Sequence, residues 1–539
     1  MNRRDMLDRL RAGSGPQAGP WDLIVIGGGA TGAGVAVDAA SRGLSTLLLE
    51  RMDFGKGTSS RSTKLVHGGV RYLEQGNIPL VMGALKERGI LRRNAPHLVH
   101  DVPFVVPNYS WWETPFYGIG LKIYDLLAGK YGFGSSRVLS REETLERLPT
   151  LRHEGLRGGV VYHDGQFDDA RLLIQLIMTA ANHGAVALNY APAVSLLKDE
   201  SGYLTGVVAE DTETSERFHL RARVVVNATG IFTDELRRMA DDGASALIQP
   251  SQGIHLVLDR SFLRGNTAIM APHTSDGRVL FAIPWHGHTV VGTTDTPIDR
   301  PCYEPMALDQ EVAFVLETAG QYLSRPPLRE DVLSVYTGIR PLVKAGGAQA
   351  GNTSSLSRDH LIHIDRNGLL TIVGGKWTTY RQMAEDTVDH AITLGRLAER
   401  PCVTEELRVH GYLEHSGPQE GLEVYGSDGE KIRELARTSP RLAAQLHPAL
   451  PYIAAEVAWA AREEMARTVE DVLARRTRAL FLNARAAMEM ARETASLLAA
   501  ELGKDGDWIQ NQETDFRSLA ANYLLKDENE RDENGRDAR

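Results

Sequence analysis

The sequence contains very little cysteine. Only Cys302 and Cys402 occur among 539 residues, and neither belongs to a CxxC or Cys/His spacing. Disulfide frameworks and structural zinc sites both need more cysteines at closer spacing. We therefore expect neither a disulfide framework nor a metal site, and a reducing cytoplasm as the setting.

Long apolar runs and an excess of positive charge are also lacking. No stretch approaches the roughly 20 consecutive apolar residues that span a bilayer. The N-terminal residues, with Arg3 and Arg4, lack the apolar segment of a secretory signal. The formal net charge of −10 argues against a nucleic-acid partner. We expect a chain that stays in the compartment where it is made.

Several catalytic signatures are absent as well. The sequence contains no GxSxG, HExxH or P-loop lysine motif, and no 12-residue EF-hand loop. Nucleophilic hydrolysis, zinc proteolysis, P-loop phosphoryl transfer and EF-hand calcium binding therefore have no support in the sequence.

The chain divides into two parts between polar ends. Strand-like runs (DLIVIG, STLLLE, RVVVNATG, HTVVGTTD and LLTIVGG) alternate with helical stretches up to about residue 395, which is typical of an α/β architecture. Residues 403–525 are rich in Ala, Leu, Glu and Arg at helical spacing and predict a separate helical domain. Residues 1–20, interrupted by Gly and Pro, and the charged residues 526–539 are predicted to be flexible tails.

A glycine-rich turn lies between the first strand-like run and a small-residue helix. Gly27, Gly29 and Gly32 form a G-x-G-x-x-G pattern, and a second strand-like run ends at Glu50. In a dinucleotide site the glycines permit a tight turn, close approach to a pyrophosphate and close helix packing. A carboxylate at the position of Glu50 binds ribose and repels a 2′-phosphate. The unit predicts FAD or NAD; the alternative is a turn whose glycines serve only to reverse the chain.

Further motifs narrow the choice of cofactor. TSSRSTKLVHGGVRYLE starts at residue 58, VNATG at 226, IPWHGHTVVGTTD at 283, YTGIRPL at 336 and VGGKWTTYRQMAE at 373. In this order and spacing the chain, over about 20–520, resembles the FAD-dependent glycerol-3-phosphate dehydrogenase family of bacterial type, within the amino-acid-oxidase-like superfamily.

The resemblance implies an α/β fold, with an FAD-binding Rossmann-like domain, an inserted mixed-sheet substrate domain and a C-terminal all-α domain. The FAD-binding segments are expected at about 21–75, 155–245 and 355–395, and the substrate segments at about 76–154 and 246–354. Because GKGTSSRSTK contains no Cys or His, we expect the FAD to be bound non-covalently.

The same resemblance implies which residues contact the cofactor. A cation and a helix N-terminus stabilise the negative charge that a reduced flavin acquires, and Lys376, Thr378 and Thr379 stand in a turn suited to this. With the turn glycines and Glu50, the implied cofactor residues are Gly27, Gly29, Gly32, Glu50, Thr58, Ser59, Ser60, Lys64, Gly68, Ala228, Thr229, Gly230, Gly375, Lys376, Thr378 and Thr379.

A phosphate ester as substrate requires fixed cations, and arginine binds phosphate well through paired hydrogen bonds. By resemblance, Arg71, Tyr72 and Arg340 hold the substrate, Lys376 lies between substrate and flavin, and Arg358 assists. Oxidising a secondary alcohol also requires a base for the hydroxyl proton. His67 and His255 are the candidates, and the sequence does not choose between them.

The family implies oxidation of glycerol 3-phosphate to dihydroxyacetone phosphate, with electrons passed to a membrane quinone, whereas closely similar oxidases use oxygen. Peripheral attachment at the cytoplasmic face of the cell membrane is therefore expected, through residues 111–133 or through 84–94 with Lys86, Arg88, Arg92 and Arg93. For both segments a helix packed on the core is the alternative. A homodimer stays open.

Two other functions compete with this interpretation. One is an FAD-dependent oxidase or dehydrogenase of another small hydroxy acid or amine, because a carboxylate also needs cations. The other is a flavin-binding regulatory or RNA-modifying adaptor. An RNA partner requires a basic stripe, and the one dense basic cluster, ARRTR at 474–478, is flanked by acids.

Overall fold

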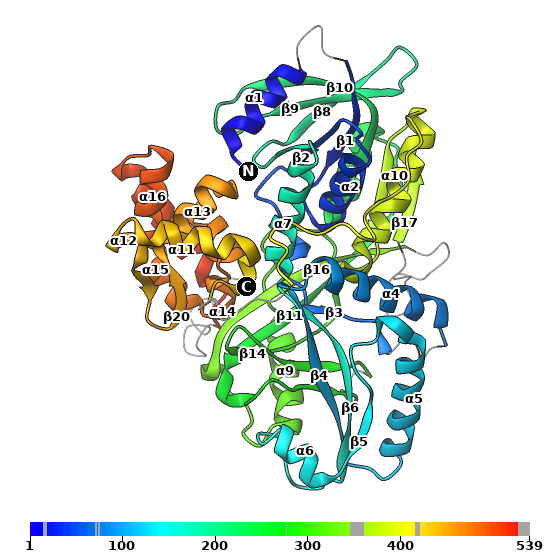
Figure 1. Ribbon diagram of the computed structural model, residues 1–539, viewed down its shortest axis with the longest axis vertical. Helices are drawn as coiled ribbons and strands as arrows, with labels where there is room; N and C mark the ends of the chain where they lie inside the picture. Colours follow the sequence, from blue (N-terminus) through cyan, green and yellow to red (C-terminus); the bar gives the residue numbers. More distant parts are fainter. Residues whose placement is uncertain are drawn as a thin grey trace, which may run out of the picture.

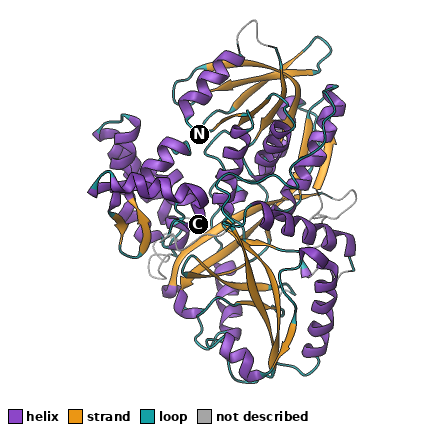
Figure 2. Cartoon of the chain, viewed as in Figure 1, coloured by secondary structure: helices purple, strands orange, loops and turns teal. Residues whose placement is uncertain are grey.

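The computed structural model describes residues 1–14, 19–70, 73, 76–275, 277–344, 360–414 and 421–525. One sheet with its helices lies at the top of Figure 1, a second sheet lies below it, and a group of helices lies at the left against both. Figure 2 shows that this third part is almost entirely helical. The predicted fold class is confirmed.

The first sheet combines strands from the start of the α/β part, β1 and β2, with strands from its end, β17 and β18. Its order is β17-β18-β10-β1-β2-β7, with β1 parallel to both β10 and β2, and with the β8–β9 hairpin extending β10. Its strands are β1 (Trp21–Ile26), β2 (Thr46–Leu49), β7 (Val186–Leu188), β8 (Ala193–Lys198), β9 (Leu204–Glu210), β10 (Arg217–Asn227), β17 (His360–Ile364) and β18 (Leu370–Gly374).

Three helices pack on this sheet because their small and apolar faces are buried against it. The central helix α2 (Ala30–Ser41) is buried at nine consecutive positions, from Gly32 to Ala40. It contacts both α7 (Asp169–Asn182) and α10 (Tyr380–Gly395). Alanine and glycine along α2 allow this close approach. The first turn of α2 is thereby fixed at the carboxyl ends of β1 and β2.

The second sheet has the order β15-β11-β14-β13-β12-β4-β6-β3, with β16 added on β11 and β5 on β6. Its strands are β3 (Leu65–Val66), β4 (Val99–Asn108), β5 (Arg137–Leu139), β6 (Gly158–Phe167), β11 (Ile248–Asp259), β12 (Ala268–Ala271), β13 (Leu280–Trp285), β14 (His288–Gly292), β15 (Thr296–Pro297) and β16 (Val332–Val343). Its helices are α4 (Ile78–Asn94), α5 (Glu113–Ala128), α6 (Arg141–Arg147) and α9 (Asp309–Tyr322).

The structure corrects the predicted segment boundaries at two strands. We expected residues 155–167 and 65–66 in the FAD-binding part, but β6 pairs along its whole length with β4, and β3 pairs with β6. Both strands therefore belong to the second sheet. Their apolar pattern predicts strands, but it carries no information on which of two adjacent sheets they join.

The C-terminal part contains more than helices. Its helices are α11 (Gly429–Arg437), α12 (Pro440–Ala443), α13 (Ala454–Glu463), α14 (Ala479–Leu482), α15 (Ala484–Leu502) and α16 (Gly506–Ala521), together with the π-helix η9 (Asp471–Arg476). A short hairpin, β19 (Gln445–His447) with β20 (Leu450–Ile453), interrupts them and was not predicted. The predicted tail 526–539 lies outside the described residues.

The predicted flexible N-terminal tail is wrong for its first half. Residues Arg3–Gly13 form helix α1, capped by the Asn2 side chain. Leu10 is fully buried in the core of the first sheet, and Arg3 forms a buried ion pair of 2.8 Å with Asp211. The buried apolar residues Met6, Leu7 and Leu10 lie on one face of α1 and span less than two helical turns. An apolar pattern this short does not identify a helix in the sequence.

Among the described residues, no helix combines the length and the apolar character needed to cross a membrane.

Candidate functional site

A cleft opens where β1, β2 and β10 of the first sheet end. Its free volume is about 1290 Å³, including the part open to solvent. Ligands of α/β sheets bind at the carboxyl ends of the strands. Ten residues predicted to contact the cofactor line this cleft: Gly27, Gly29, Glu50, Thr58, Ser59, Ala228, Thr229, Gly230, Gly375 and Lys376.

The glycine turn has the geometry that its pattern predicts. Gly27 has φ +112°, and a Cβ there would overlap the backbone of Ala228, so only glycine fits. A Cβ at Gly32 would overlap the carbonyl oxygen of Gly27, which explains how α2 begins so close to β1. Gly29 is the N-cap of α2 and has no side chain to cap the first-turn N–H groups. The partial positive charge of the helix end therefore faces the cleft.

The Glu50 carboxylate fixes the shape of the turn from the neighbouring strand. It accepts hydrogen bonds from the N–H groups of Gly28, at 2.6 Å, and Met52, at 2.8 Å. Burial raises the pKa of Glu50, and these two hydrogen bonds oppose that shift. Glu50 thus holds the glycine turn and also lines the cleft.

Ser59 joins three of the predicted cofactor segments. Its Oγ accepts from the N–H of Ala30 in the first turn of α2, at 2.9 Å, and its carbonyl oxygen accepts from Trp377 Nε1, at 2.8 Å. The adjacent Thr58 donates to the carbonyl oxygen of Ile339 on β16, at 2.6 Å. The 3₁₀ helix Thr58–Ser60 therefore contacts three other parts of the chain. These are the glycine turn, the turn that carries Lys376 (the lysine turn) and the second sheet.

The cleft has room for a cofactor against exposed backbone. A Cβ at Gly57 or at Gly230 would meet no atom within 4 Å, although both residues line the cleft. Glycine at these positions leaves backbone bare where a flat or phosphate-bearing group can approach. Together with the first turn of α2, which its own N-cap residue Gly29 leaves without a side-chain cap, the residues present fit a dinucleotide.

Six predicted cofactor residues are not among those that line the cleft. Lys64 is corrected outright: it is fully buried, and its Nζ donates to Asp169 Oδ2 at 2.7 Å and to the Ser60 carbonyl at 2.8 Å. Burial lowers the pKa of Lys64 to about 7. The chain turns inward after Ser60, which the motif does not reveal. The other five are Gly32, Ser60, Gly68, Thr378 and Thr379.

A predicted substrate residue, Arg340, and a predicted base, His255, lie on the paired strands β16 and β11. Arg340 on β16 lies next to Pro341, which lines the cleft, and its guanidinium donates to Thr293 Oγ1 and the Thr294 carbonyl at 3.2 and 3.1 Å. A Cβ at Gly253 would come within 2.6 Å of Arg340 Nη2. Since His255 lies two residues further along β11, the guanidinium and the imidazole share one face of that strand.

His255 is held as a buried neutral imidazole. Its ring stacks on Tyr336 with centroids 4.8 Å apart, and its Nε2 shares a hydrogen bond of 2.9 Å with Thr63 Oγ1. Within the described part of the chain, Nδ1 has no hydrogen-bond partner. Burial, then the charges of Lys64 and Arg340, lower the pKa of His255 well below its usual value. The ring is therefore unprotonated near neutral pH.

His67, the second candidate base, lies in a different setting. Its backbone N–H donates to Thr378 Oγ1 at 3.2 Å, so it lies beside the lysine turn. Arg71, Tyr72 and Arg358 lie outside the described residues, and their predicted roles stay predictions.

Sequence reasoning missed the residues that follow Glu50. Arg51 lines the cleft, with its guanidinium 4.8 Å from the Phe232 ring and 5.2 Å from the Tyr303 ring, and it pairs with Glu235. Lys56 also lines the cleft. The signal available was position, because both lie between Glu50 and the TSSRSTK motif.

Comparison with protein families gives two matches. Residues 22–381 match the family described as FAD dependent oxidoreductase, and residues 370–508 match the C-terminal domain of alpha-glycerophosphate oxidase. The first match includes every cleft-lining residue named above. The second begins just before the lysine turn.

Named relatives are similar along most of the chain. A mitochondrial glycerol-3-phosphate dehydrogenase of Mesocricetus auratus is 41% identical over 538 residues, covering 94% of this chain and 73% of that protein. One from Arabidopsis thaliana is 41% identical, covering 89% of this chain and 83% of that protein. Among solved structures, the glycerol-3-phosphate dehydrogenase of Bacillus halodurans, complexed with FAD, is 31% identical with a TM-score of 0.79, covering 97% of this chain and 99% of that one.

We expect Glu50→Gln to weaken FAD binding by about tenfold or more, because the amide loses the charge with which Glu50 accepts two backbone N–H groups. The dissociation constant is measured from the fluorescence of flavin released on dilution. Glu200→Gln, an exposed change, is the control. Equal retention of FAD by both variants would remove Glu50 from the site.

Proposed function

The chain belongs to the FAD-dependent glycerol-3-phosphate dehydrogenase family, and from this premise we propose that it oxidises sn-glycerol 3-phosphate to dihydroxyacetone phosphate and passes the electrons to a membrane quinone. FAD is the cofactor. The observation that carries the proposal is that a fixed cation, Arg340 on β16, and a neutral imidazole, His255 on the paired strand β11, lie on one face of the second sheet beside the cofactor cleft.

Each group has a task in this reaction. Bound FAD supplies the hydride acceptor for the hydrogen on C2. Arg340 is oriented by Thr293, Thr294 and Asp295, so its guanidinium is preorganised for a phosphate rather than free to rotate. His255 accepts the hydroxyl proton, and Thr63 fixes the orientation of its ring.

The lysine turn serves the flavin side of the cleft. Gly374 and Gly375 have φ +81° and +72°, which lets the chain double back after β18 and place Lys376 in the lining. Lys376 then precedes the short 3₁₀ helix Trp377–Thr379 that leads into α10. Its cation favours the reduced, anionic form of a flavin bound beside it.

The first test is the visible absorbance of the purified protein under anaerobic conditions. Adding glycerol 3-phosphate is expected to bleach the oxidised-flavin band at about 450 nm. Arg340→Leu is expected to keep the flavin spectrum but to lower kcat/KM about 10- to 100-fold, because it removes charged hydrogen bonds to phosphate.

A band that persists in the wild type would overturn the substrate and favour a small hydroxy acid or amine, which the same measurement screens. Reoxidation of the bleached protein by a soluble quinone, compared with reoxidation by oxygen, tests the acceptor. Faster reoxidation by oxygen would make the protein an oxidase.

The pH dependence tests the base. Because the pKa of His255 is depressed, its basic form persists as pH falls, and the acid limb of kcat/KM is expected below pH 6.5. His255→Gln is expected to lower kcat about 10²- to 10⁴-fold. A phosphate ester itself ionises near about pH 6, so any limb that the variant retains belongs to the substrate. Wild-type turnover in this variant would transfer the role to His67.

The surface of α5 supports attachment to a lipid bilayer. Its buried side, with Leu121 and Tyr124, packs on the second sheet. Its outer side carries a helical stripe of exposed apolar residues, and α5 runs along the lower right edge of the molecule in Figure 1. The stripe and the preceding tryptophan are Trp111, Trp112, Phe116, Ile119, Ile123 and Leu126.

This stripe has the features of a helix that lies in a membrane interface. Leu126 is 80% exposed and Trp111 is 76% exposed, which is unusual for side chains of this size in contiguous positions. The exposed Lys122 and Arg137 flank the groove beside the stripe. Tryptophan, an apolar face and basic neighbours favour the interface of anionic lipids. We place this face on the cytoplasmic surface of the cell membrane.

In the other predicted membrane segment, residues 84–94, the basic side chains have contacts within the chain. Arg88 is buried against Asp164 at 2.6 Å, and Lys86 and Arg93 both bind Glu405. Arg92 lies over the Phe133 ring at 4.6 Å. Of the basic residues of α4, Arg88 therefore serves the interior, whereas Arg92 and Arg93 have contacts within the chain but stay exposed.

We expect Ile119→Ser/Leu126→Ser to lower binding to anionic phospholipid vesicles about tenfold or more, since each change removes a side chain that would be buried in lipid. Flotation with vesicles measures binding, and the flavin spectrum reports folding. The matched control is Met306→Ser/Leu328→Ser, which alters exposed apolar residues elsewhere. Unchanged vesicle binding would contradict the membrane assignment; a changed sedimentation coefficient without vesicles would indicate a protein partner.

A further inference from the structure

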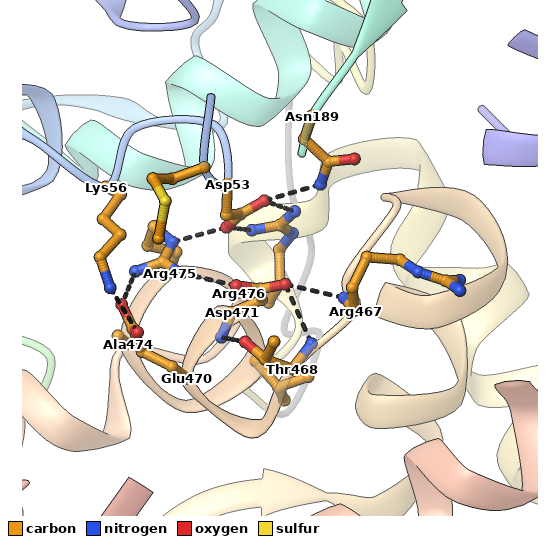
Figure 3. Close-up of polar contacts among 12 residues, drawn as sticks. Asp53, Lys56, Asn189, Arg467, Thr468, Glu470, Asp471, Ala474, Arg475 and Arg476 are labelled. Carbon is orange, nitrogen blue, oxygen red and sulfur yellow. Dashed lines mark hydrogen bonds and ion pairs between the residues drawn. The ribbon is translucent and has the colours of Figure 1, made fainter. Parts of the chain in front are cut away.

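A buried cluster of charges joins the C-terminal part to the loop after β2 (Figure 3). Its core contains three carboxylates and three cations in mutual contact, and the set continues through Lys56 to Glu304 and through Arg476 to Glu464. The carboxylates are Asp53, Glu470 and Asp471, and the cations are Lys56, Arg475 and Arg476.

Asp53 is the centre of this cluster. Arg475 Nε donates to its Oδ2 at 2.5 Å, and Arg476 donates to both oxygens at 2.7 and 2.9 Å. Asn189 Nδ2 adds a further hydrogen bond of 3.1 Å. The carboxylate is fully buried, and the two guanidinium groups hold its pKa far below the usual range. Asp53 is therefore charged, and π-helix η9 supplies its counter-ions.

The residues next to Asp53 touch the glycine turn. The N–H of Gly55 donates to the carbonyl oxygen of Gly28 at 3.1 Å. The Phe54 ring lies so close to Gly28 that a Cβ there would be 2.7 Å from its Cδ1. Lys56 lines the cleft, and its Nζ donates to Glu470 Oε2 at 2.5 Å. The loop 51–57 thus has the cofactor turn on one side and the C-terminal part on the other.

We propose that Arg475 and Arg476 act as positioning residues for the cofactor: by fixing Asp53 they hold the loop 51–57 against the glycine turn, so that affinity for FAD depends on C-terminal residues outside the cleft. The inference goes beyond the proposed function, since it requires only FAD and no particular substrate.

The geometry favours positioning over simple adhesion between two parts of the chain. A buried ion cluster adds little net stability, because the cost of desolvating the charges offsets their attraction. The cluster instead fixes the position of Asp53, because the planar guanidinium of Arg476 binds the two Asp53 oxygens in one direction. Loss of that arrangement releases a short loop whose neighbours shape the cleft.

A second buried ion pair across the same interface provides the matched control. Glu464 meets Arg171 on α7 at 2.6 and 2.8 Å, and both side chains are almost fully buried. Glu464 also touches Arg476, through an ion pair of 3.7 Å from Nε and a hydrogen bond of 2.7 Å from Nη2 to its backbone carbonyl, but among the described residues it forms no hydrogen bond or ion pair with the loop 51–57. Glu464→Gln therefore removes the charge that pairs with Arg171 but keeps the backbone carbonyl that Arg476 contacts, and it leaves both hydrogen bonds from Arg476 to Asp53 in place.

The experiment compares Asp53→Asn with Glu464→Gln in the full-length holoenzyme. The dissociation constant for FAD comes from the fluorescence of flavin released on dilution, and the thermal unfolding midpoint is measured on the same samples. Asp53→Asn is expected to raise the FAD dissociation constant about tenfold or more. Glu464→Gln is expected to lower the midpoint comparably and to change the dissociation constant by about twofold or less.

Arg476→Lys keeps the charge but loses the paired geometry, so it is expected to weaken FAD binding as well. It replaces Asp53→Asn if that variant does not fold. The double variant Asp53→Asn/Arg476→Lys is expected to bind FAD about as weakly as Asp53→Asn alone, because both changes act through the same Asp53–Arg476 contact. An equal loss of FAD in Glu464→Gln, or unchanged FAD binding in Asp53→Asn and Arg476→Lys, would overturn the proposal. Bleaching by glycerol 3-phosphate plays no part in this outcome.

Discussion

Buried carboxylates that need a positive partner determine how the three parts of this chain fit together. Asp53, Asp169 and Glu464 are each almost fully enclosed, and each meets an arginine from across the interface between the first sheet and the C-terminal helices. An unpaired charge at such depth is very costly. The interface therefore has one register in which every carboxylate is paired.

This arrangement reaches the cofactor cleft because the paired carboxylates lie close in sequence, or by hydrogen bond, to residues of the site. Asp53 stands three residues after Glu50, and Asp169, which pairs with Arg478 at 3.1 Å, also accepts from the N–H and hydroxyl of Ser62 at 3.0 and 2.7 Å. Ser62 is itself next to Thr63, the partner of His255. The C-terminal part thus bears on both the cofactor side and the substrate side of the site, although it lines neither.

Local patterns predicted the chemistry of the site better than its surroundings. Three features could be identified from the sequence: the glycine turn, Glu50 and the lysine turn. Each lies at the end of a buried strand, where the backbone geometry restricts which residue types fit. Lys64 was misplaced because its motif says nothing of the inward turn that buries it against Asp169. Helix α1 and the hairpin β19–β20 were missed because their stability comes from tertiary burial rather than from a long periodic pattern.

The two candidate membrane segments illustrate the same limit. In the sequence, residues 111–133 and 84–94 are equal candidates, the second because four basic side chains occur within eleven residues. Folding treats them differently: Arg88 becomes the buried partner of Asp164, whereas α5 directs its apolar stripe outward. A basic side chain in the sequence can pair with an acidic side chain elsewhere in the chain once the protein folds. An apolar side chain that stays exposed after folding has found no such partner within the described residues, and it is therefore the stronger indication of a surface that meets something else.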